Sequence, residues 1–543
     1  MRRPVVLAPF VFSILALAGC AADSAEPDVG GEEGAFSSNQ ATLLDFEFDA
    51  QLETDSSWND KQTIQDQLLY TIGHLNHDKS VGRLDNLVLS NIQKTEAGGK
   101  ITIKYHAKLP VAWGSKTNLP TSYKLSLPKD TSSAGISTFT EKHKHTCVDW
   151  GAHEVDTGSM WYYYRPRRSG CDITEAEVVT VTATATKSTE NTTSKYPEYH
   201  KVWEDNRLEI VAIFGKYEAN ATSGDAGIDG YNAFIAMMKR ELRVIAPNVA
   251  TLPAGVTDAP GPAVNDVAFE GTLADGKTVK VVALLVDAIT QVPPAFNARY
   301  EGLTPTADII MYNGHAGLGQ NVRALAAKGK WVSQKYQMFF MNGCDTYAYV
   351  DGSLAQTRAR LNPDDPSGTK YMEFVTNAMP SFFHSMPSAS TALMKGLLSY
   401  QAPKTYDQIF EAIDRSEIVL VTGEEDNVFQ PGMPIGTGGG GGGGGGAAFT
   451  PFEESDTVAK GAQKAYAYDV QEGVYEITLS GTGDADLYVK MNETPTTQTY
   501  DCRPYKNGSA EACTVRVAAP GKMNVMVRGY ATTSTFKVAG KKQ

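Results

Sequence analysis

Two residue types that can carry out nucleophilic catalysis follow short apolar segments in the middle of the sequence. Residues 309–312 lead into His315, and residues 338–341 lead into Cys344. A cysteine attacks a carbonyl carbon as its thiolate, and a nearby imidazole takes up the thiol proton. If the two segments are neighbouring strands, their ends lie at the same edge of a sheet. The spacing therefore predicts a thiol and an imidazole facing one crevice.

Glycines lie beside both residues. Gly314 precedes the histidine, Gly317 follows it two positions later, and Gly343 precedes the cysteine. Glycine lets a substrate backbone approach closely and leaves amide N–H groups free to hold an oxyanion. The alternative for either residue alone is structural, because a histidine after a strand is often hydrogen-bonded scaffolding and a cysteine there is often core packing. Their joint occurrence favours catalysis.

The cysteine count leaves Cys344 without an evident partner. Cys147 and Cys171 bracket an aromatic segment of a β-rich region, and Cys502 and Cys513 lie eleven residues apart in a second β-rich region. Each pair is predicted to form a disulfide, which an exported protein permits. His143, His145 and Cys147 alternate as on one face of a strand and would suit Zn²⁺. A disulfide-bonded cysteine cannot ligate, so exposed histidines are the favoured interpretation.

Residues 205–430 have the pattern of an α/β domain. Apolar strands are predicted at 208–215, 279–286, 309–312, 337–341, 371–375 and 418–422, with helices at 231–243, 390–398 and 406–415. Strands that are apolar on both faces and separated by helices favour an open parallel sheet covered by helices. Functional groups in such sheets gather at the carboxyl ends of the strands.

The flanking regions alternate with period two, which is typical of half-buried strands. Residues 41–204 predict an antiparallel β domain with one helix near residues 61–75, and residues 449–543 predict a small β-sandwich. Residues 431–448 contain nine consecutive glycines and predict a flexible linker. The fold expected is multidomain, with an α/β domain between two β domains.

The first residues carry an export signal. Arg2 and Arg3 precede an apolar run that ends at Gly19, and residues 17–20 resemble the bacterial lipobox, with Cys20 as the lipid acceptor. Residues 1–19 are therefore expected to be a lipoprotein signal peptide, and the polar residues 20–40 a tether. An ordinary secretory signal with an incidental cysteine is the alternative. Ala21 is not the Asp that commonly retains lipoproteins at the inner membrane, which favours the outer membrane.

Composition excludes one class of partner. The net charge is −13, hydrophobic residues make up 42% of the chain and charged residues 20%, and the mean hydropathy is −0.28. Nucleic-acid binding requires a basic stripe that the sequence lacks. The expected location is the cell envelope or cell surface, with the lipid anchor as the contact to the membrane.

The central region resembles the caspase-like cysteine peptidases, which include gingipains, clostripain, legumain and separase. In those enzymes one apolar strand leads to a His and the next leads to the nucleophilic Cys. The resemblance implies that His315 is the general base and Cys344 the nucleophile. It also implies that the N–H of Cys344 and an N–H just after His315 form the oxyanion hole. The chain departs from the family with Ala316 where Gly is usual and Gly343 where many members have Ala.

Acidic residues lie beside the predicted crevice. Asp345 follows the cysteine, and Glu424, Glu425 and Asp426 follow the last strand. Such acids would select a substrate with a basic side chain or hold Ca²⁺, whereas a solvated loop is the alternative. The proposed reaction requires no cofactor and no metal.

The C-terminal region resembles the bacterial pre-peptidase C-terminal domain. The resemblance is carried by residues 481–489, 500–505 and 525–530. Such domains accompany secreted peptidases of different catalytic types, and some bind collagen or other insoluble polymers. The expected function is a cell-envelope cysteine endopeptidase acting on proteins or peptides. The alternatives are a non-catalytic surface-binding protein with a degenerate peptidase-like domain, and hydrolysis at another site in the same crevice.

Overall fold

The apolar segments of the middle region form one eight-stranded sheet. The computed structural model describes residues 36–349, 352–424, 427–436, 451–470, 473–517 and 521–542. The strand order is β14-β13-β12-β11-β7-β10-β9-β8. The five strands from β13 to β10 are parallel. β14 pairs antiparallel with β13 on one side of them, and on the other side β9 pairs antiparallel with β10 and β8 with β9. The strands are β7 (Arg207–Gly215), β8 (Ala250–Leu252), β9 (Asp266–Thr272), β10 (Thr278–Val286), β11 (Ile309–Asn313), β12 (Gln337–Asn342), β13 (Met372–Asn377) and β14 (Val419–Gly423).

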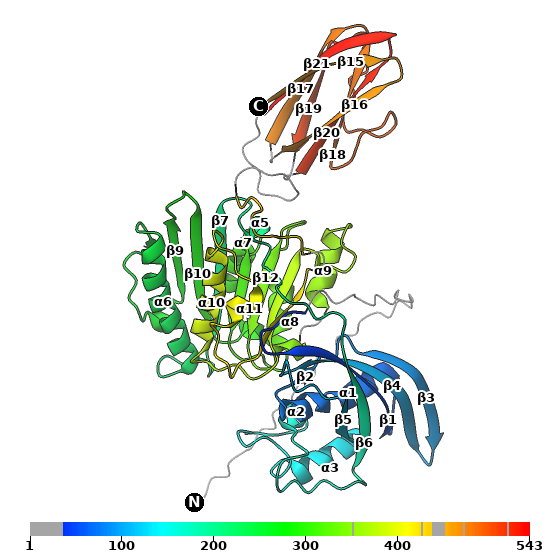
Figure 1. Ribbon diagram of the computed structural model, residues 1–543, viewed down its shortest axis with the longest axis vertical. Helices are drawn as coiled ribbons and strands as arrows, with labels where there is room; N and C mark the ends of the chain where they lie inside the picture. Colours follow the sequence, from blue (N-terminus) through cyan, green and yellow to red (C-terminus); the bar gives the residue numbers. More distant parts are fainter. Residues whose placement is uncertain are drawn as a thin grey trace, which may run out of the picture.

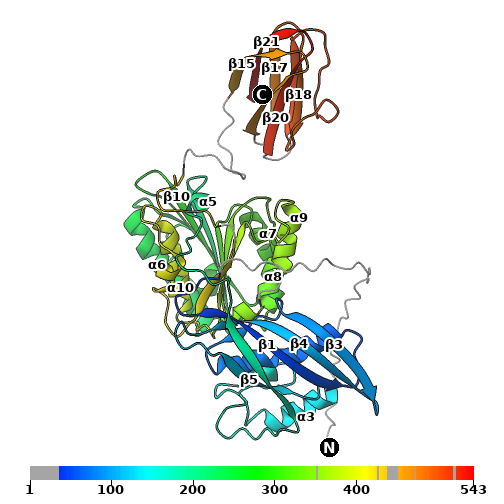
Figure 2. The ribbon, with the colours of Figure 1, turned by 45° about the vertical axis from the view of Figure 1, so that its right-hand side comes forward.

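Helices cover both faces of this sheet (Figure 2). In β7, Ile210 and Ala212 enter one hydrophobic core, whereas Val211 and Ile213 enter another. Burial on both sides explains why the parallel strands are continuous apolar runs. One face carries α5 (Tyr199–Val202), α6 (Ala226–Ile245), α10 (Met386–Leu398) and α11 (Tyr406–Phe410), and the other carries α7 (Pro294–Leu303), α8 (Gln320–Lys328) and α9 (Ser353–Leu361).

The N-terminal region forms an antiparallel sheet of six strands in the order β2-β4-β1-β6-β5, with β3 paired to β4. The strands are β1 (Thr42–Thr54), β2 (Val81–Gly82), β3 (Val88–Ala97), β4 (Lys100–Trp113), β5 (Ser122–Pro128) and β6 (Val178–Lys187). The helices are α1 (Asp60–Leu68), α2 (Tyr70–Asn76), α3 (Ser133–His143) and α4 (Met160–Tyr163). The predicted strand at residues 143–147 is wrong, because His143 ends a helix there.

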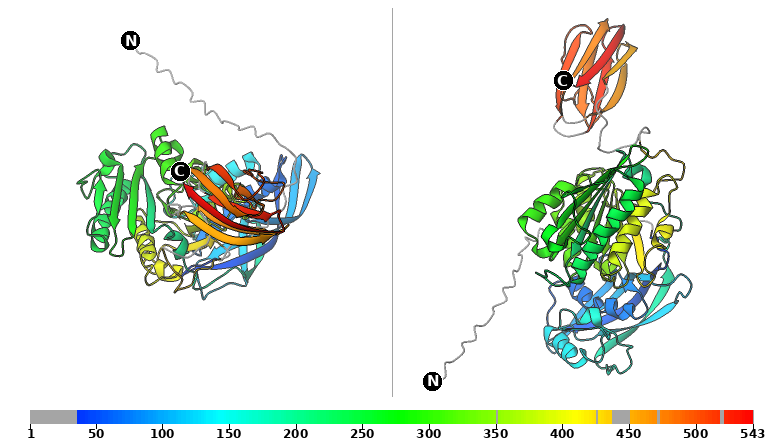
Figure 3. Two further views of the ribbon diagram at one scale, coloured as in Figure 1. Left: turned by 90° about the horizontal axis from the view of Figure 1, so that it is seen from above. Right: turned by 90° about the vertical axis from the view of Figure 1, so that its left-hand side faces the viewer.

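The N-terminal sheet and the central sheet share one hydrophobic core. Leu44 and Val111 belong to the same cluster as Tyr347 and Leu420 of the central region. The N-terminal region lies against the carboxyl ends of the parallel strands of the central sheet (Figures 1 and 3). It therefore packs onto the α/β domain rather than standing apart as an independent module.

The last residues of the predicted tether are ordered against the central domain. Phe36 is 1% exposed, and Ser37 pairs with Val421 through two backbone hydrogen bonds of 3.0 and 2.8 Å. The prediction of a flexible tether to residue 40 is therefore wrong for residues 36–40. The signal peptide, Cys20 and the whole run of nine glycines lie outside the described residues.

The C-terminal region is a β-sandwich of a four-stranded sheet (β15-β21-β17-β19) and a three-stranded sheet (β16-β20-β18). Its strands are β15 (Phe452–Ala459), β16 (Gln463–Val470), β17 (Gly473–Thr482), β18 (Ala485–Met491), β19 (Glu511–Val517), β20 (Gly521–Gly529) and β21 (Thr533–Lys542). Alternate apolar side chains of both sheets form its core. Across the described ranges, no helix has the length and apolar character that crossing a membrane requires.

Candidate functional site

The two candidate catalytic residues lie at the same end of adjacent parallel strands. β11 and β12 pair in register with Asn313 opposite Asn342, so His315 and Cys344 each lie two residues beyond the last pair. The Gly314 N–H donates to the Asn342 carbonyl at 3.2 Å. The predicted adjacency of the two loops is confirmed by this pairing, whereas their catalytic role stays a prediction.

Gly343 brings the two loops into direct contact. A Cβ atom at this position would lie 2.7 Å from the Gly314 carbonyl oxygen and 3.3 Å from the Ala316 nitrogen. Only glycine allows that approach without moving the backbone. Among the described residues, the N–H groups of Ala316 and Cys344 make no hydrogen bond. Two free donors therefore lie where the histidine loop meets the cysteine loop.

The histidine loop lies at the topological switch point of the sheet. After β7 the chain forms β10 on one side of that strand and then β11 on the other. In open α/β sheets, ligands bind in the crevice outside the carboxyl ends at this point. The loop is fixed there because the Tyr312 hydroxyl and the Asn321 amide each donate to the His315 carbonyl at 2.8 Å.

The ring of His315 is held by the loop that follows β7. Its Nε2 lies 3.3 Å from the Tyr217 carbonyl oxygen, and the rings of Tyr217 and Phe383 lie 4.9 and 5.0 Å from its own. Since a carbonyl only accepts, this bond places the proton on Nε2 and leaves Nδ1 as the basic nitrogen. Burial lowers the pKa of His315, so the neutral ring is the form present near pH 7.

Asp225 fixes the loop that carries Tyr217. Its carboxylate caps α6 and accepts from the backbone N–H groups of Tyr217, Glu218, Gly227 and Ile228 at 2.7–3.0 Å. A buried carboxylate with four donors defines the path of this loop. The Tyr217 carbonyl is thus presented to the imidazole by a rigid support.

The thiol of Cys344 is unpaired and half-buried. Its Sγ lies 3.7 Å from the Ser381 carbonyl oxygen. Burial, and next the charge of Asp345, raise the pKa of this thiol to about 11, so it is protonated at neutral pH. The site therefore holds a neutral thiol and a neutral imidazole.

Asp345 adopts a left-handed backbone conformation with φ of 52° directly after the cysteine. Its carboxylate is buried and accepts from the Asn76 amide at 3.1 Å. Burial raises the pKa of Asp345 to about 7, against a smaller lowering by Asn76 and Arg165. Because this carboxylate faces the N-terminal domain, the prediction that it selects a basic substrate is wrong.

Glu424, the acidic residue that directly follows β14, lies at the opposite end of the sheet from the crevice. β14 runs antiparallel to β13, and Gly423 pairs with Glu373 near the start of that strand. Glu424 is buried there in an ion pair with Lys201 at 3.0 Å. The prediction that Glu424 lies by the crevice is therefore wrong, whereas Glu425 and Asp426 lie outside the described residues.

Both predicted disulfides are confirmed, between Cys147 and Cys171 and between Cys502 and Cys513. His143 is fully buried, with its ring nitrogens 2.9 Å from Asp172 and 3.2 Å from Glu177. The expectation that His143 is exposed is wrong. His143, Cys147 and Asp172 lie close together, but the sulfur of Cys147 is bonded to Cys171 and is no metal ligand.

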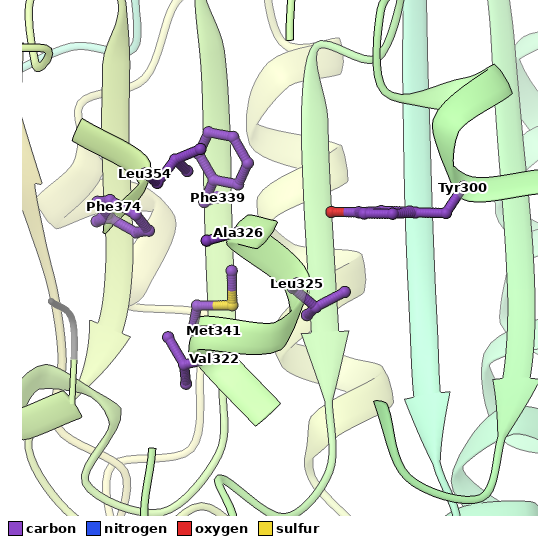
Figure 4. A pocket seen from close by; sticks show the side chains of 8 residues that line it. All are labelled: Tyr300, Val322, Leu325, Ala326, Phe339, Met341, Leu354 and Phe374. Carbon is purple, nitrogen blue, oxygen red and sulfur yellow. The ribbon is translucent and has the colours of Figure 1, made fainter. Parts of the chain in front are cut away.

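Two hollows lie away from the crevice. One, of about 10 Å³, is lined by apolar side chains between the sheet and α8 and includes Tyr300 (Figure 4). That volume suits about one water molecule. The other, of about 460 Å³, opens on the N-terminal sheet among polar side chains such as Gln93 and Lys104. Neither is lined by His315 or Cys344.

Sequence reasoning missed the residues that the N-terminal domain contributes to the crevice. Tyr162 and Tyr163, which precede Cys171 in the disulfide-closed segment, pack against the hydrophobic cluster that contains Tyr349 of the segment after Cys344. Trp161 contacts Tyr349, with ring centroids 6.3 Å apart. The dense aromatic sequence was the available signal, but nothing in it indicated which domain the rings contact.

Comparison with known proteins identifies the C-terminal domain. Residues 470–529 match the family model described as "Bacterial pre-peptidase C-terminal domain", which confirms the predicted resemblance. "Zinc metalloprotease" of Helicobacter pylori is 42% identical over 78 residues, which cover 14% of this chain and 30% of that protein. "Alkaline serine exoprotease A" of Vibrio alginolyticus is 41% identical over 79 residues, which cover 14% of this chain and 15% of that protein.

One solved structure of a single domain aligns with part of this chain. The pre-peptidase C-terminal domain of a collagenase from Bacillus anthracis is 18% identical, with a TM-score of 0.14, and the match covers 17% of this chain and 90% of that one. The chain spans less than a third of the length of the two curated relatives described above. One of these is named as a zinc enzyme and the other as a serine enzyme, so the shared domain does not identify the catalytic residues of this chain.

Proposed function

We propose that this chain is a cysteine endopeptidase of the caspase-like kind, with Cys344 as nucleophile and His315 as general base. The observation that carries the proposal is the placement of an unpaired thiol and an imidazole at the carboxyl ends of two adjacent parallel strands. Protease relatives that share the C-terminal domain support it. Thiol and imidazole together are the standard pair for acyl transfer.

In the proposed reaction, His315 Nδ1 takes the proton from the Cys344 thiol as the sulfur attacks the scissile carbonyl carbon. The N–H groups of Cys344 and Ala316 donate to the oxyanion of the tetrahedral intermediate. The C–N bond then breaks, and the imidazolium returns the proton to the leaving amine. Water, deprotonated by the same nitrogen, hydrolyses the thioester to a carboxylic acid and restores the thiol.

The Tyr217 carbonyl keeps the imidazole in the tautomer that this reaction requires. With the Nε2 proton donated to that carbonyl, Nδ1 is the nitrogen free to exchange a proton. When the ring becomes charged, the same carbonyl stabilises the imidazolium. The reaction as written uses no metal or cofactor.

The chain acts at the cell envelope, anchored through lipid on Cys20 in the outer membrane or at the cell surface. The lipobox-like sequence supports this location. Substrates are proteins or peptides, and the C-terminal domain holds the enzyme on an extracellular polymer.

A second candidate function is a non-catalytic surface-binding protein. The raised pKa of the Cys344 thiol favours it, because only a small fraction is thiolate at neutral pH. Alkylation by iodoacetamide, mapped by mass spectrometry, and cleavage of unfolded casein separate the two functions. For a peptidase, Cys344→Ala and His315→Ala abolish cleavage, and His315→Ala also slows alkylation of Cys344. If the wild-type protein does not cut casein, and Cys344 is alkylated at the same rate in the wild type and in His315→Ala, the peptidase function is refuted and the surface-binding function is favoured.

A further inference from the structure

A second group of chemically active side chains lies in the N-terminal domain, where α3 ends. His143 is the last residue of α3, and the N–H of Cys147, one helical turn later, donates to the His143 carbonyl at 2.9 Å. Asp172 directly follows Cys171, the disulfide partner of Cys147. One ligand atom each of His143, Cys147 and Asp172 lie within 4.8 Å of one another. Imidazole, thiolate and carboxylate are the side chains that bind Zn²⁺ in proteins.

The spacing of these atoms resembles that of the ligands around a zinc ion. The Sγ of Cys147 lies 3.7 Å from Nδ1 of His143 and 3.7 Å from Oδ1 of Asp172, and Nδ1 lies 2.9 Å from that oxygen. Tetrahedral coordination of Zn²⁺ places neighbouring ligand atoms about 3.4–3.8 Å apart. Cys171 adds a second sulfur, because it is bonded to Cys147. The four-ligand group is therefore His143, Cys147, Cys171 and Asp172.

Glu177 orients the ring of His143 as a metal ligand requires. Its Oε1 lies 3.2 Å from Nε2 of the fully buried ring. When Nε2 donates its proton to this carboxylate, Nδ1 is the nitrogen that faces Cys147 and Asp172. A carboxylate behind the histidine commonly supports a zinc-bound imidazole. The Asp172 side chain is 54% exposed, so an ion can enter from solvent.

We propose that the four-ligand group binds Zn²⁺ when the Cys147–Cys171 bond is reduced, so that the metal ion replaces the disulfide as the crosslink. A dithiol reductant gives two electrons and two protons to the disulfide and is itself oxidised to a disulfide. Zn²⁺ then displaces the protons of both thiols. In the oxidised protein the two sulfurs are bonded to each other and bind no metal. The two crosslinks therefore exclude each other.

Either crosslink closes the segment that carries α4. Trp161 of α4 contacts Tyr349, which lies in the segment after Cys344. The aromatic residues beside the crevice are thus held in place in both redox states. The metal site itself does not depend on the proposed peptidase function, since none of its ligands belongs to the crevice.

The test is Zn²⁺ binding by the full-length protein, reduced with a phosphine in the presence of Zn²⁺ and then freed of unbound ion. Mass spectrometry of the metal gives the stoichiometry, and competition with a chromophoric chelator gives the affinity. We expect one Zn²⁺ per reduced chain and none per oxidised chain. Asp172→Asn keeps the size of the side chain but is a poorer ligand, so its Kd is expected to be at least about tenfold higher. His145→Ala removes an exposed histidine of the same segment and is the matched control, with unchanged affinity.

Co²⁺ in place of Zn²⁺ identifies the sulfur ligands. We expect sulfur-to-cobalt charge-transfer absorption in the reduced wild type and in Cys502→Ser/Cys513→Ser, but none in Cys147→Ser/Cys171→Ser. Near-UV circular dichroism measures folding, and reduced protein with Zn²⁺ is expected to keep the spectrum of the oxidised protein. Reduced protein that binds no metal, whether folded or unfolded, would overturn the proposal. Equal affinities of Asp172→Asn and the wild type, or charge-transfer absorption that persists in Cys147→Ser/Cys171→Ser, would do the same.

Discussion

The side-chain amide of Asn342 donates to the side-chain oxygen of Asn313 at 3.0 Å, so the ends of β11 and β12 are joined through side chains as well as backbones. Asn342 also accepts from Ser381 at 2.6 Å, and Asn313 accepts from Ser390 at 2.8 Å. All four residues are buried. This network links the histidine loop, the cysteine loop and the loop after β13, so it holds the crevice in shape.

Replacement of Asn342 by Ala is expected to destabilise the fold and disable the crevice. The change removes the 2.6 Å bond from the Ser381 hydroxyl, which keeps only the Glu417 carboxylate at 3.2 Å, and it removes the donor to Asn313. These losses cost about 2 kcal/mol in free energy of unfolding. Urea denaturation measures this cost. Gln320→Ala, at an exposed position of α8, is the control with little expected change. Equal unfolding free energies for the two variants would show that the network contributes nothing.

Gly343→Ala is expected to separate the two loops. The new Cβ would lie 2.7 Å from a backbone oxygen, so the Gly314 carbonyl must move and the distance between His315 and Cys344 changes. The expected result is loss of casein cleavage of at least about a hundredfold, since small displacements of catalytic groups have that effect. Gly302→Ala is the matched control, because a Cβ there meets no atom within 4 Å. Full cleavage by Gly343→Ala would contradict the close packing of the loops.

The sequence was sufficient to locate the parallel strands and the residues at their ends. Each parallel strand is buried on both faces, and that environment produces an unbroken apolar run that is visible without a structure. β8 and β9 were missed because β8 has only three residues and β9 is buried on one face alone, so neither forms the unbroken apolar run of the parallel strands. The position of β14 in the sequence was predicted, but its antiparallel direction was not. Glu424 was therefore expected at the carboxyl ends of the parallel strands, whereas it lies at their amino ends.

The contacts between domains were beyond sequence reasoning. Asn76 reaches Asp345, and Trp161 reaches Tyr349, only because the N-terminal domain packs on the carboxyl ends of the central strands. The pattern of a segment indicates that it has a buried face but does not indicate the partner of that face. His143 shows the same limit on a smaller scale, since its spacing suited a strand whereas it ends α3 between two carboxylates.

Asp345 is expected to make the protein less stable as pH rises from 4 to 7. The folded state keeps its proton up to a pKa of about 7, whereas an unfolded aspartate loses it near 4. The folded state therefore binds more protons in this window, and the free energy of unfolding falls with increasing pH. Asp345→Asn lacks this ionisation. The free energy of unfolding of this variant, relative to that of the wild type, therefore increases as pH rises from 4 to 7, by at most about 4 kcal/mol.

Denaturation curves at several pH values between 4 and 8 test this expectation. Asn tolerates the left-handed backbone at position 345 and still accepts from Asn76. Other buried carboxyls with raised pKa values, such as Asp308, contribute equally to both proteins and cancel in the difference. If the difference in free energy of unfolding between Asp345→Asn and the wild type stays constant with pH, the pKa of Asp345 in the folded protein is not raised.

Loss of the Cys147–Cys171 disulfide is expected to expose the nucleophile. The bond joins two cysteines that are 24 positions apart and closes a segment that includes Tyr162, and removing it costs about 3 kcal/mol. Because burial is the largest influence on the Cys344 thiol, a looser segment lowers its pKa and accelerates alkylation. The double variant Cys147→Ser/Cys171→Ser is compared with Cys502→Ser/Cys513→Ser, which changes only the C-terminal domain. Faster alkylation in the second variant, or in neither, would contradict this coupling.

Cys20→Ser is expected to release the protein from the membrane fraction. The substitution removes the proposed acceptor of the lipid and leaves the described domains unchanged. Fractionation of cells, followed by mass spectrometry of the N-terminal peptide, measures both location and modification. Retention of Cys20→Ser in the membrane fraction, or an unmodified wild-type peptide, would refute lipidation at this residue.

The pairing of Ser37 with Val421 limits the distance between the central domain and the proposed lipid-bearing residue Cys20. Only fifteen residues separate Cys20 from Phe36, the first residue packed into the shared core. Even fully stretched, they span about 50 Å. A lipid on Cys20 would therefore confine the proposed proteolysis to a layer close to the bilayer, and substrates would have to come to that membrane surface.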